Sequence, residues 1–99
     1  MCAGKNEAVG IATTLLEDRL TACGNVVGPV ESVFRWKGEV ETETEYMLLL
    51  KTQKKHIRRI TEKIIELHSY DLPEISTFPV TGGNEAYMDW VAESTEPEV

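Results

Sequence analysis

The sequence has few cysteines and no long apolar run. Its 99 residues include two cysteines, Cys2 and Cys23, and neither a dense cysteine pattern nor a secretory signal is visible. We therefore expect free thiols in a reducing, cytoplasmic compartment rather than a disulfide-stabilised secreted domain. No apolar stretch approaches the roughly 18 residues that a membrane-spanning helix requires, so a membrane protein is not expected.

Basic residues are also scarce. Ten lysines and arginines stand against 17 aspartates and glutamates, which gives a formal net charge of -7. Because duplex nucleic acid is bound largely by releasing counterions onto a basic surface, this balance argues against a nucleic-acid partner and fits small cations better. The basic side chains that do occur gather on one predicted helix, where they form either a solvated face or an anion site: Lys54, Lys55, Arg58, Arg59 and Lys63.

Motifs typical of catalysis are missing as well. The sequence contains no nucleophile elbow, phosphate-binding glycine loop, H-E-x-x-H or C-x-x-C motif. His56 and His68 lie about three helical turns apart on the helix predicted over residues 54–68. We expect that the protein is not an enzyme.

The length predicts a single domain over residues 1–99. Apolar residues recur at spacings of three and four over residues 7–20 and 54–68, which predicts two amphipathic helices. Asn84 is placed to cap a third, short helix. Residues 91–99 are rich in glutamate and contain a proline, so we expect a frayed acidic tail there.

A long β-hairpin is predicted over residues 32–52. Phe34 and Trp36 share one face of the first arm, and Gly38 supplies the permissive backbone that a tight reversal needs. The returning arm begins with alternate glutamates and ends in an unbroken apolar run over residues 46–50, which is typical of a strand buried on both sides. A strand that is solvent-exposed at one end and buried at the other is expected to reach beyond its own small domain, toward a partner chain.

The order of elements predicts an α+β fold of the ferredoxin-like, split βαβ type. A strand is predicted over residues 21–30, followed by the hairpin, a helix, a short strand over residues 74–80 and a last helix. The first strand of such a sandwich is missing or truncated, because only Met1, Cys2 and Ala3 precede the first helix.

Five motifs in this order resemble the CutA divalent-cation tolerance family. They are T-A-C-G-N-V (21–26), W-K-G (36–38), L-K-T (50–52), L-H-S-Y-D-L-P-E-I (67–75) and Y-M-D-W (87–90), within a resemblance that spans about residues 7–91. The resemblance implies a ferredoxin-like subunit akin to the PII signalling proteins. It also implies a homotrimer in which the long hairpins extend each sheet onto its neighbour.

The resemblance further implies copper binding through a cysteine at the end of the first strand and a histidine in an H-x-Y motif. His68 matches that histidine, with Ser69 in place of the usual proline, and Cys2 is the nearest equivalent of the cysteine. Copper, or another divalent metal, suits a thiolate and an imidazole. The alternatives are a helix C-terminal role for His68 and a disordered terminal position for Cys2.

Other side chains are candidates for an interface or an intersubunit cleft. Lys51 is expected near Tyr70 and Glu74, either in a functional cleft or in an ion pair with Glu74. The aromatic residues are expected in packing or at a subunit interface. These interface candidates are Phe34, Trp36, Lys51, Tyr70, Glu74 and Trp90. The alternate glutamates at 39–45 are too widely spaced to converge on one cation.

Two functions remain as hypotheses. The first is a homotrimeric CutA-like protein that acts in the response to divalent metals and binds copper or a similar ion through His68 and Cys2. The second is a PII-like signalling or scaffold protein that binds a small anionic ligand or a protein partner at its intersubunit clefts, for which Lys51 and the basic helix are the motivation.

Overall fold

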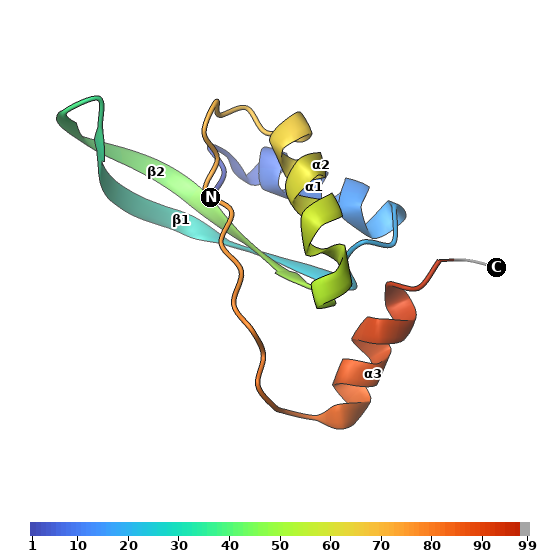
Figure 1. Ribbon diagram of the computed structural model, residues 1–99. Coiled ribbons are helices and arrows are strands. Elements are labelled where there is room, and N and C mark those ends of the chain that lie inside the picture. The colour runs from blue at the N-terminus through green and yellow to red at the C-terminus, as the bar shows by residue number, and fades with distance from the viewer. Residues whose placement is uncertain (98–99) are drawn as a thin grey trace.

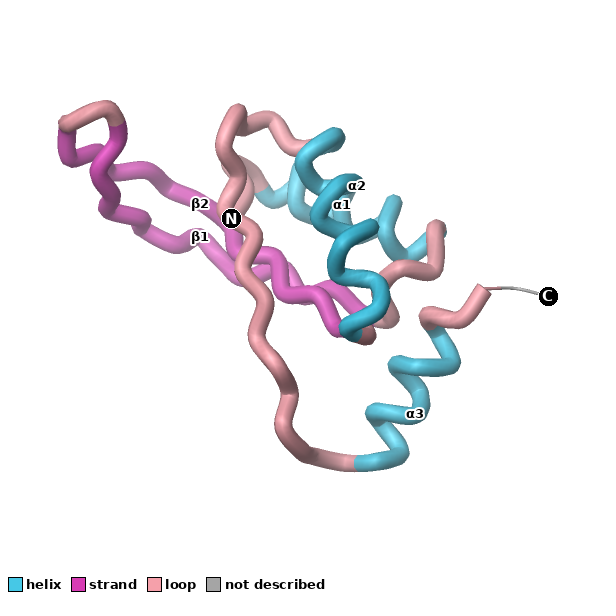
Figure 2. Tube along the Cα trace, in the orientation of Figure 1, coloured by secondary structure: helices cyan, strands magenta, loops and turns pink. Residues whose placement is uncertain are grey.

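The computed structural model describes residues 1–97 and has an α+β fold (Figure 1). The elements follow the order α1 (Lys5–Glu17), β1 (Cys23–Trp36), β2 (Glu39–Lys51), the 3-10 turn Lys54–His56, α2 (Ile57–Leu67) and α3 (Glu85–Ser94). Helices α1 and α2 lie beside one half of the hairpin, and α3 stands apart at the end of a long loop (Figure 2). No helix among the described residues is long and apolar enough to cross a membrane.

The predicted hairpin is confirmed, and its turn is formed by Lys37 and Gly38. Both residues have positive φ angles, 50° and 83°, between the paired ends Trp36 and Glu39. Positive φ at both central positions is the requirement of the two-residue turn that matches the twist of the strands. A glycine meets that requirement at little cost.

Residues 21–30 do not form a separate strand, contrary to the sequence prediction. Residues 23–30 belong to β1, whose pairing with β2 shifts register between Val27 and Val30. Gly28 and Pro29 occupy this irregularity, and a Cβ atom at Gly28 would overlap the ring of Tyr46. The glycine and proline at these positions therefore mark a β-bulge rather than the end of a strand.

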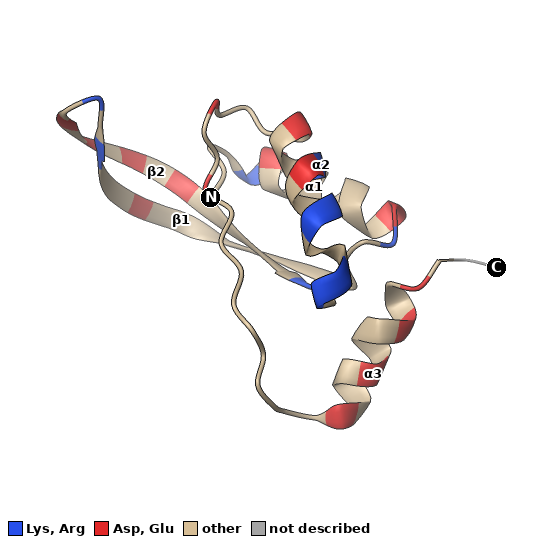
Figure 3. Cartoon of the chain, in the orientation of Figure 1, with Lys and Arg blue, Asp and Glu red and all other residues tan. Residues whose placement is uncertain are grey.

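The core lies between the two helices and the inner half of the hairpin. Buried residues from the N-terminus, α1 and α2 form it: Cys2, Ala8, Ile11, Leu15, Ile60 and Ile64. Tyr46, Leu48 and Leu50 of β2 pack against this cluster from the sheet. The outer half of the hairpin extends beyond the helices, and most of its acidic residues lie on the second arm, β2 (Figure 3).

The sheet of the described residues contains only β1 and β2. Ahead of α1, one isolated bridge joins the chain to this sheet: Cys2 and Tyr46 exchange both backbone hydrogen bonds, at 2.7 and 2.8 Å. The strand predicted over residues 74–80 is wrong, since that segment has no strand assignment. Its backbone has no neighbouring strand with which to pair.

Helix α3 begins as predicted, because the Asn84 side chain accepts hydrogen bonds from the amides of Ala86 and Tyr87. The frayed tail expected over residues 91–99 is wrong for its first part: α3 continues to Ser94, and Val91 and Thr95 are buried. The last two residues, 98–99, lie outside the described residues.

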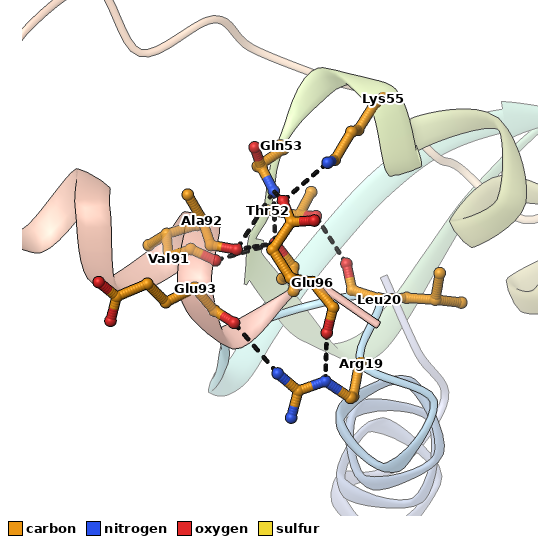
Figure 4. A network of polar contacts seen from close by, with 10 residues as sticks. Arg19, Leu20, Thr52, Gln53, Lys55, Val91, Ala92, Glu93 and Glu96 are labelled. Carbon is orange, nitrogen blue, oxygen red and sulfur yellow. Dashed lines mark hydrogen bonds and ion pairs between the residues drawn. The ribbon is translucent and has the colours of Figure 1, made fainter. Parts of the chain in front are cut away.

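A set of polar contacts, here called the C-terminal latch, fastens the end of α3 to the body (Figure 4). Its members are Arg19, Gln53, Lys55, Thr95 and Glu96. The Arg19 guanidinium donates to the carbonyls of Glu93 and Glu96, and Gln53 Nε2 donates to Thr95 Oγ1 at 2.8 Å. Lys55 completes the latch with an ion pair to Glu96 at 2.7 Å. Arg19 and Gln53 thereby add side-chain donors to the carbonyls of Glu93 and Ala92, at the end of α3 where the carbonyls of a helix lack their regular partners.

Candidate metal centre

Three side chains of metal-ligand type meet beside the N-terminus. The sulfur of Cys2, a carboxylate oxygen of Glu7 and a ring nitrogen of His68 all lie within 4.8 Å of one another. Cys2 is held by its bridge to Tyr46, Glu7 by the first turn of α1, and His68 by its position at the C-terminal cap of α2. The structure thus brings together the two residues predicted as ligands and adds a third.

His68 is buried and both of its ring nitrogens are hydrogen-bonded. Its side chain is 2% exposed. Nδ1 accepts the amide hydrogen of Tyr70 at 3.0 Å, and Nε2 lies 2.8 Å from the carbonyl oxygen of Met1. Because Nδ1 accepts, the proton of the neutral ring belongs on Nε2, which donates to Met1. His68 therefore does more than end a helix, since it ties the N-terminus to the loop after α2.

Glu7 links the same two segments. Its Oε1 accepts from the amide of Ala3 at 3.4 Å and lies 3.9 Å from His68 Nε2, while Oε2 accepts from the amide of Ser69 at 3.2 Å. Burial acts to raise the pKa of this carboxyl, but the hydrogen bonds from Ser69 and the neighbouring His68 outweigh burial and hold the pKa below its usual value. Glu7 is therefore ionised at neutral pH and supplies the negative charge of the centre.

Cys2 is the most shielded member of the centre. The residue is 2% exposed, so the expectation of a disordered terminal position is wrong, and its thiol is free. Burial raises the pKa of this thiol, and the nearby carboxylates of Glu7 and Glu45 add to the effect. Without a metal, the sulfur is therefore protonated at neutral pH.

Tyr70 connects the centre to the hairpin. Its ring lies 4.7 Å from that of His68, and its hydroxyl donates to Glu45 Oε2 at 3.0 Å. Glu45 is only 7% exposed, although the preceding glutamates of β2 are solvent-exposed. Burial and the Glu45 carboxylate raise the pKa of Tyr70 to about 12. We call Cys2, Glu7, His68, Tyr70 and Glu45 the N-terminal network.

The three ligand types fit a borderline or soft metal ion, but the geometry must tighten to hold one. In a tetrahedral zinc site, metal–ligand distances of about 2.0–2.3 Å bring neighbouring ligand atoms to about 3.5 Å from one another. The observed spread of up to 4.8 Å therefore requires an inward movement of about 1 Å. A metal ion held by Nε2 would leave the ring proton on Nδ1, where it would face the amide hydrogen of Tyr70. Such an ion would consequently break the hydrogen bond from Tyr70.

The remaining interface candidates do not gather at this centre. Phe34 and Trp36 lie at the far end of the hairpin, 38% and 42% exposed. Trp90 lies on α3 against Tyr87, with ring centroids 5.5 Å apart. Lys51 ends β2, and within residues 1–97 it makes no ion pair with Glu74, whose carboxylate accepts from Ser76. Tyr70 is the one interface candidate that belongs to the N-terminal network.

The basic helix is paired in part within the chain. Lys55 forms its ion pair with Glu96, and Arg58 pairs with Glu62 one turn further along α2, at 3.3 Å. Both pairs lie on an exposed surface, as a solvated helix face requires.

Sequence reasoning missed Glu7, Glu45 and the C-terminal latch. Glu7 is one of 17 acidic residues, and no spacing distinguishes it, because its partner Ser69 lies 62 positions away, in the loop after α2. The sequence did offer one indication for Glu45. It is the last glutamate before the apolar run of β2, where the solvent-exposed half of the strand meets the buried half.

Comparison with known proteins places this chain in a family. The chain matches the family model described as CutA1 divalent ion tolerance protein over residues 1–94. The divalent-cation tolerance protein CutA of Thermus thermophilus is 42% identical over 85 residues, which cover 86% of this chain and 82% of that protein. The chloroplastic protein CutA of Arabidopsis thaliana is 36% identical, and the match covers 86% of this chain and 47% of the plant protein. The chain thus spans about half the length of that relative.

Solved structures show the same fold. The structure of the divalent cation tolerance protein from Thermus thermophilus superposes with a TM-score of 0.93 at 39% identity, covering 96% of this chain and 92% of that one. The CutA structure from Archaeoglobus fulgidus gives the same TM-score at 34% identity. By family model, by sequence identity and by fold, the chain belongs to the CutA1 divalent ion tolerance family.

Proposed function

We propose that this protein acts in the response to divalent metal ions by binding such an ion through Cys2, Glu7 and His68. Copper is the leading candidate for that ion. The observation that carries the proposal is the convergence of a thiol, a carboxylate and an imidazole within 4.8 Å, with the thiol of Cys2 buried and the other two residues partly buried. Thiolate and imidazole are ligands that suit copper and zinc. The names of the relatives, divalent-cation tolerance proteins, are consistent with this function.

The structure leads us to expect weak and pH-dependent binding. The Cys2 thiol must lose a proton that burial retains, and His68 must give up its hydrogen bonds to Met1 and Tyr70. Each of these costs reduces the affinity. The ion would therefore be bound as a signal or cargo whose concentration varies, and this requires no catalytic chemistry.

Calorimetric titration of the intact chain with copper tests the proposal, with Co²⁺ as a redox-inert companion whose thiolate absorption band reports on Cys2. We expect one ion per chain, and a loss of binding in Cys2→Ser, His68→Ala and Glu7→Gln. Cys23→Ser and His56→Gln are matched controls, because they remove the other cysteine and the other histidine. Unchanged binding in the first three variants, or equal losses in the controls, would reject the site.

We also propose that the protein is a cytoplasmic homotrimer assembled through the outer half of the hairpin. This part of the sheet has no helix over it and exposes apolar side chains, with Val33 67% and Val40 65% exposed beside Phe34 and Trp36. Light scattering should then give three times the chain mass of 11.1 kDa. The trimer of a Val33→Glu, Val40→Glu double variant should dissociate, and a monomeric parent chain would contradict the proposal.

The ion pairs of Lys55 and Arg58 leave the alternative, an anion-binding PII-like protein, with less support.

A further inference from the structure

A small hollow lies where the end of α2 meets α1. Its volume is about 310 Å³, at the lower end of the range for small-molecule sites. Four of its residues stand at positions i, i+3, i+4 and i+7 of α1, so they form one stripe along that helix, and the last residue of α2 adds a further wall. We call it the α1 hollow, and its lining residues are Glu7, Gly10, Ile11, Thr14 and Leu67.

Gly10 keeps the α1 hollow open, although the packing of the fold does not require a glycine there. A Cβ atom at Gly10 would meet no atom outside its own stretch of helix within 4 Å. Glycine in the interior of a helix destabilises that helix relative to alanine. Gly10 therefore weakens α1 without relieving any close contact, and its remaining effect is the space that it leaves in the hollow.

The carboxylate of Glu7 forms a charged wall of the α1 hollow. Within residues 1–97, no lysine or arginine forms an ion pair with Glu7, and its one ionic neighbour is the His68 ring, 3.9 Å away. The carboxylate accepts from the amides of Ala3 and Ser69, which occupy two of its roughly four lone-pair positions. Since the Glu7 side chain is also 22% exposed, a cationic donor from solvent can reach the remaining positions.

The other walls of the α1 hollow are uncharged and largely apolar. Ile11 is buried at 4% exposure, and Leu67 is 39% exposed. The Thr14 hydroxyl donates to the carbonyl of Gly10 at 3.1 Å, so its proton is already used within α1. A hydrated metal ion gains nothing from such walls, whereas an organic cation with a short alkyl chain matches both the charge and the apolar surface.

We propose that the α1 hollow binds a small primary ammonium ion that carries a short alkyl chain. The ammonium group donates to the carboxylate of Glu7, and the alkyl chain lies beside Gly10, against Ile11 and Leu67. This binding requires no metal ion, so the proposal goes beyond the metal centre and does not rest on it.

Titration of the full chain with n-butylammonium chloride tests the α1 hollow, with amide NMR as the readout and a chelator in the buffer. We expect saturable shifts of the Gly10, Ile11 and Leu67 amides relative to sodium chloride at the same ionic strength. The dissociation constant should lie in the millimolar range, because the ligand has few atoms. The uncharged analogue n-butanol, which has the same alkyl chain, should bind at least about tenfold more weakly.

Two kinds of substitution separate the charge of the α1 hollow from its space. Glu7→Gln removes the charge and Gly10→Leu fills the space, so each should weaken the binding of n-butylammonium at least about tenfold. Gly10→Ala fills less of the hollow and should weaken binding less. Because both Gly10 variants replace a helical glycine, their melting temperatures should not fall, which verifies that they fold. Glu17→Gln and Val9→Leu are matched controls on α1 outside the hollow, and they should bind like the parent chain.

Three outcomes would overturn the proposal. The first is the absence of saturable shifts at the amides of the α1 hollow. The second is equal binding of n-butanol, which would make the hollow an unselective apolar cleft. The third is unchanged binding in Gly10→Leu, which would place the ammonium ion elsewhere. A failed copper titration would reject the metal centre alone, because the chelator keeps metal ions out of the ammonium titration.

Discussion

The N-terminal network and the C-terminal latch each hold one end of the chain against the body of the fold, but they are built from different groups. The network is rich in titratable side chains: Glu7 lies within ion-pair reach of His68, the Tyr70 hydroxyl donates to Glu45, and the Tyr70 backbone amide donates to the His68 ring. The latch instead joins the Gln53 amide, the Thr95 hydroxyl and the charged side chains of Arg19, Lys55 and Glu96, largely to carbonyls of α3 and the residues after it. If the proposed metal centre is correct, the first end responds to protons and metal ions, whereas the second end holds α3 in place.

The largest expected difference between the two ends is in metal affinity. Loss of an outer-shell partner commonly lowers metal affinity about 10- to 100-fold, and loss of a ligand should do at least as much. We therefore expect His68→Ala to lower copper affinity by about 100-fold or more, whereas Thr95→Val should leave it unchanged. Competition with a chelator of known affinity measures both. An equal effect of the two substitutions would remove the distinction between the ends.

The latch should carry more of the stability. Thr95 is fully buried, and its hydroxyl donates to the Val91 carbonyl at 2.9 Å while accepting from Gln53. Thr95→Val removes both of these buried hydrogen bonds, although Gln53 keeps its weaker bonds to Ala92 and Glu96. The loss should lower the free energy of unfolding by about 1–3 kcal/mol in urea denaturation. Thr13→Val is the matched control, because that hydroxyl makes the same kind of bond, to Val9, on an exposed helix surface. Equal losses would mean that the latch adds no stability of its own.

The network should make stability depend on alkaline pH. The pKa of Tyr70 is about 12 in the folded chain and about 10 in an unfolded one. The folded state therefore retains the proton more strongly, so this contribution is complete below pH 10 and is lost as the pH rises through 12. In Tyr70→Phe, thermal unfolding should show a smaller decline over this range. Tyr87→Phe, on α3, should keep the decline of the parent chain.

A smaller effect is expected at acid pH. The pKa of Glu7 is held below its usual value in the folded chain, so its contribution is present above the unfolded pKa of about 4.3 and is lost as the pH falls through the folded pKa. Glu7→Gln should therefore flatten the acid limb of the stability profile. The exposed Glu62→Gln serves as the control. An unchanged acid limb in Glu7→Gln would place the acid sensitivity elsewhere.

The features that depend on local chemistry were predictable from the sequence. Gly38 and the alternation around it predicted the turn, and Asn84 predicted the start of α3. The pairing of Cys2 with His68 was predictable only through the resemblance to a family, because 66 positions separate them and no spacing links them. The strand at residues 74–80 was predicted wrongly, since apolar alternation describes a side-chain pattern and a strand also needs a neighbour.

The latch could not be predicted, for a different physical reason. Its donors, Arg19 and Gln53, bond to backbone carbonyls, which every residue carries and no sequence pattern marks. The acidic composition of residues 91–99 suggested a frayed tail, but Thr95 and Glu96 are the residues on which the latch closes.

The central claim is that a metal ion binds His68 at Nε2 and releases Tyr70 from Nδ1. Nuclear magnetic resonance of the ring nitrogens of His68 and the amide of Tyr70, followed during titration with Zn²⁺, measures both events at once. We predict that the ring proton moves from Nε2 to Nδ1 and that exchange of the Tyr70 amide accelerates in step with binding. Saturation with Zn²⁺ that leaves the His68 nitrogens and the Tyr70 amide unchanged would contradict the account.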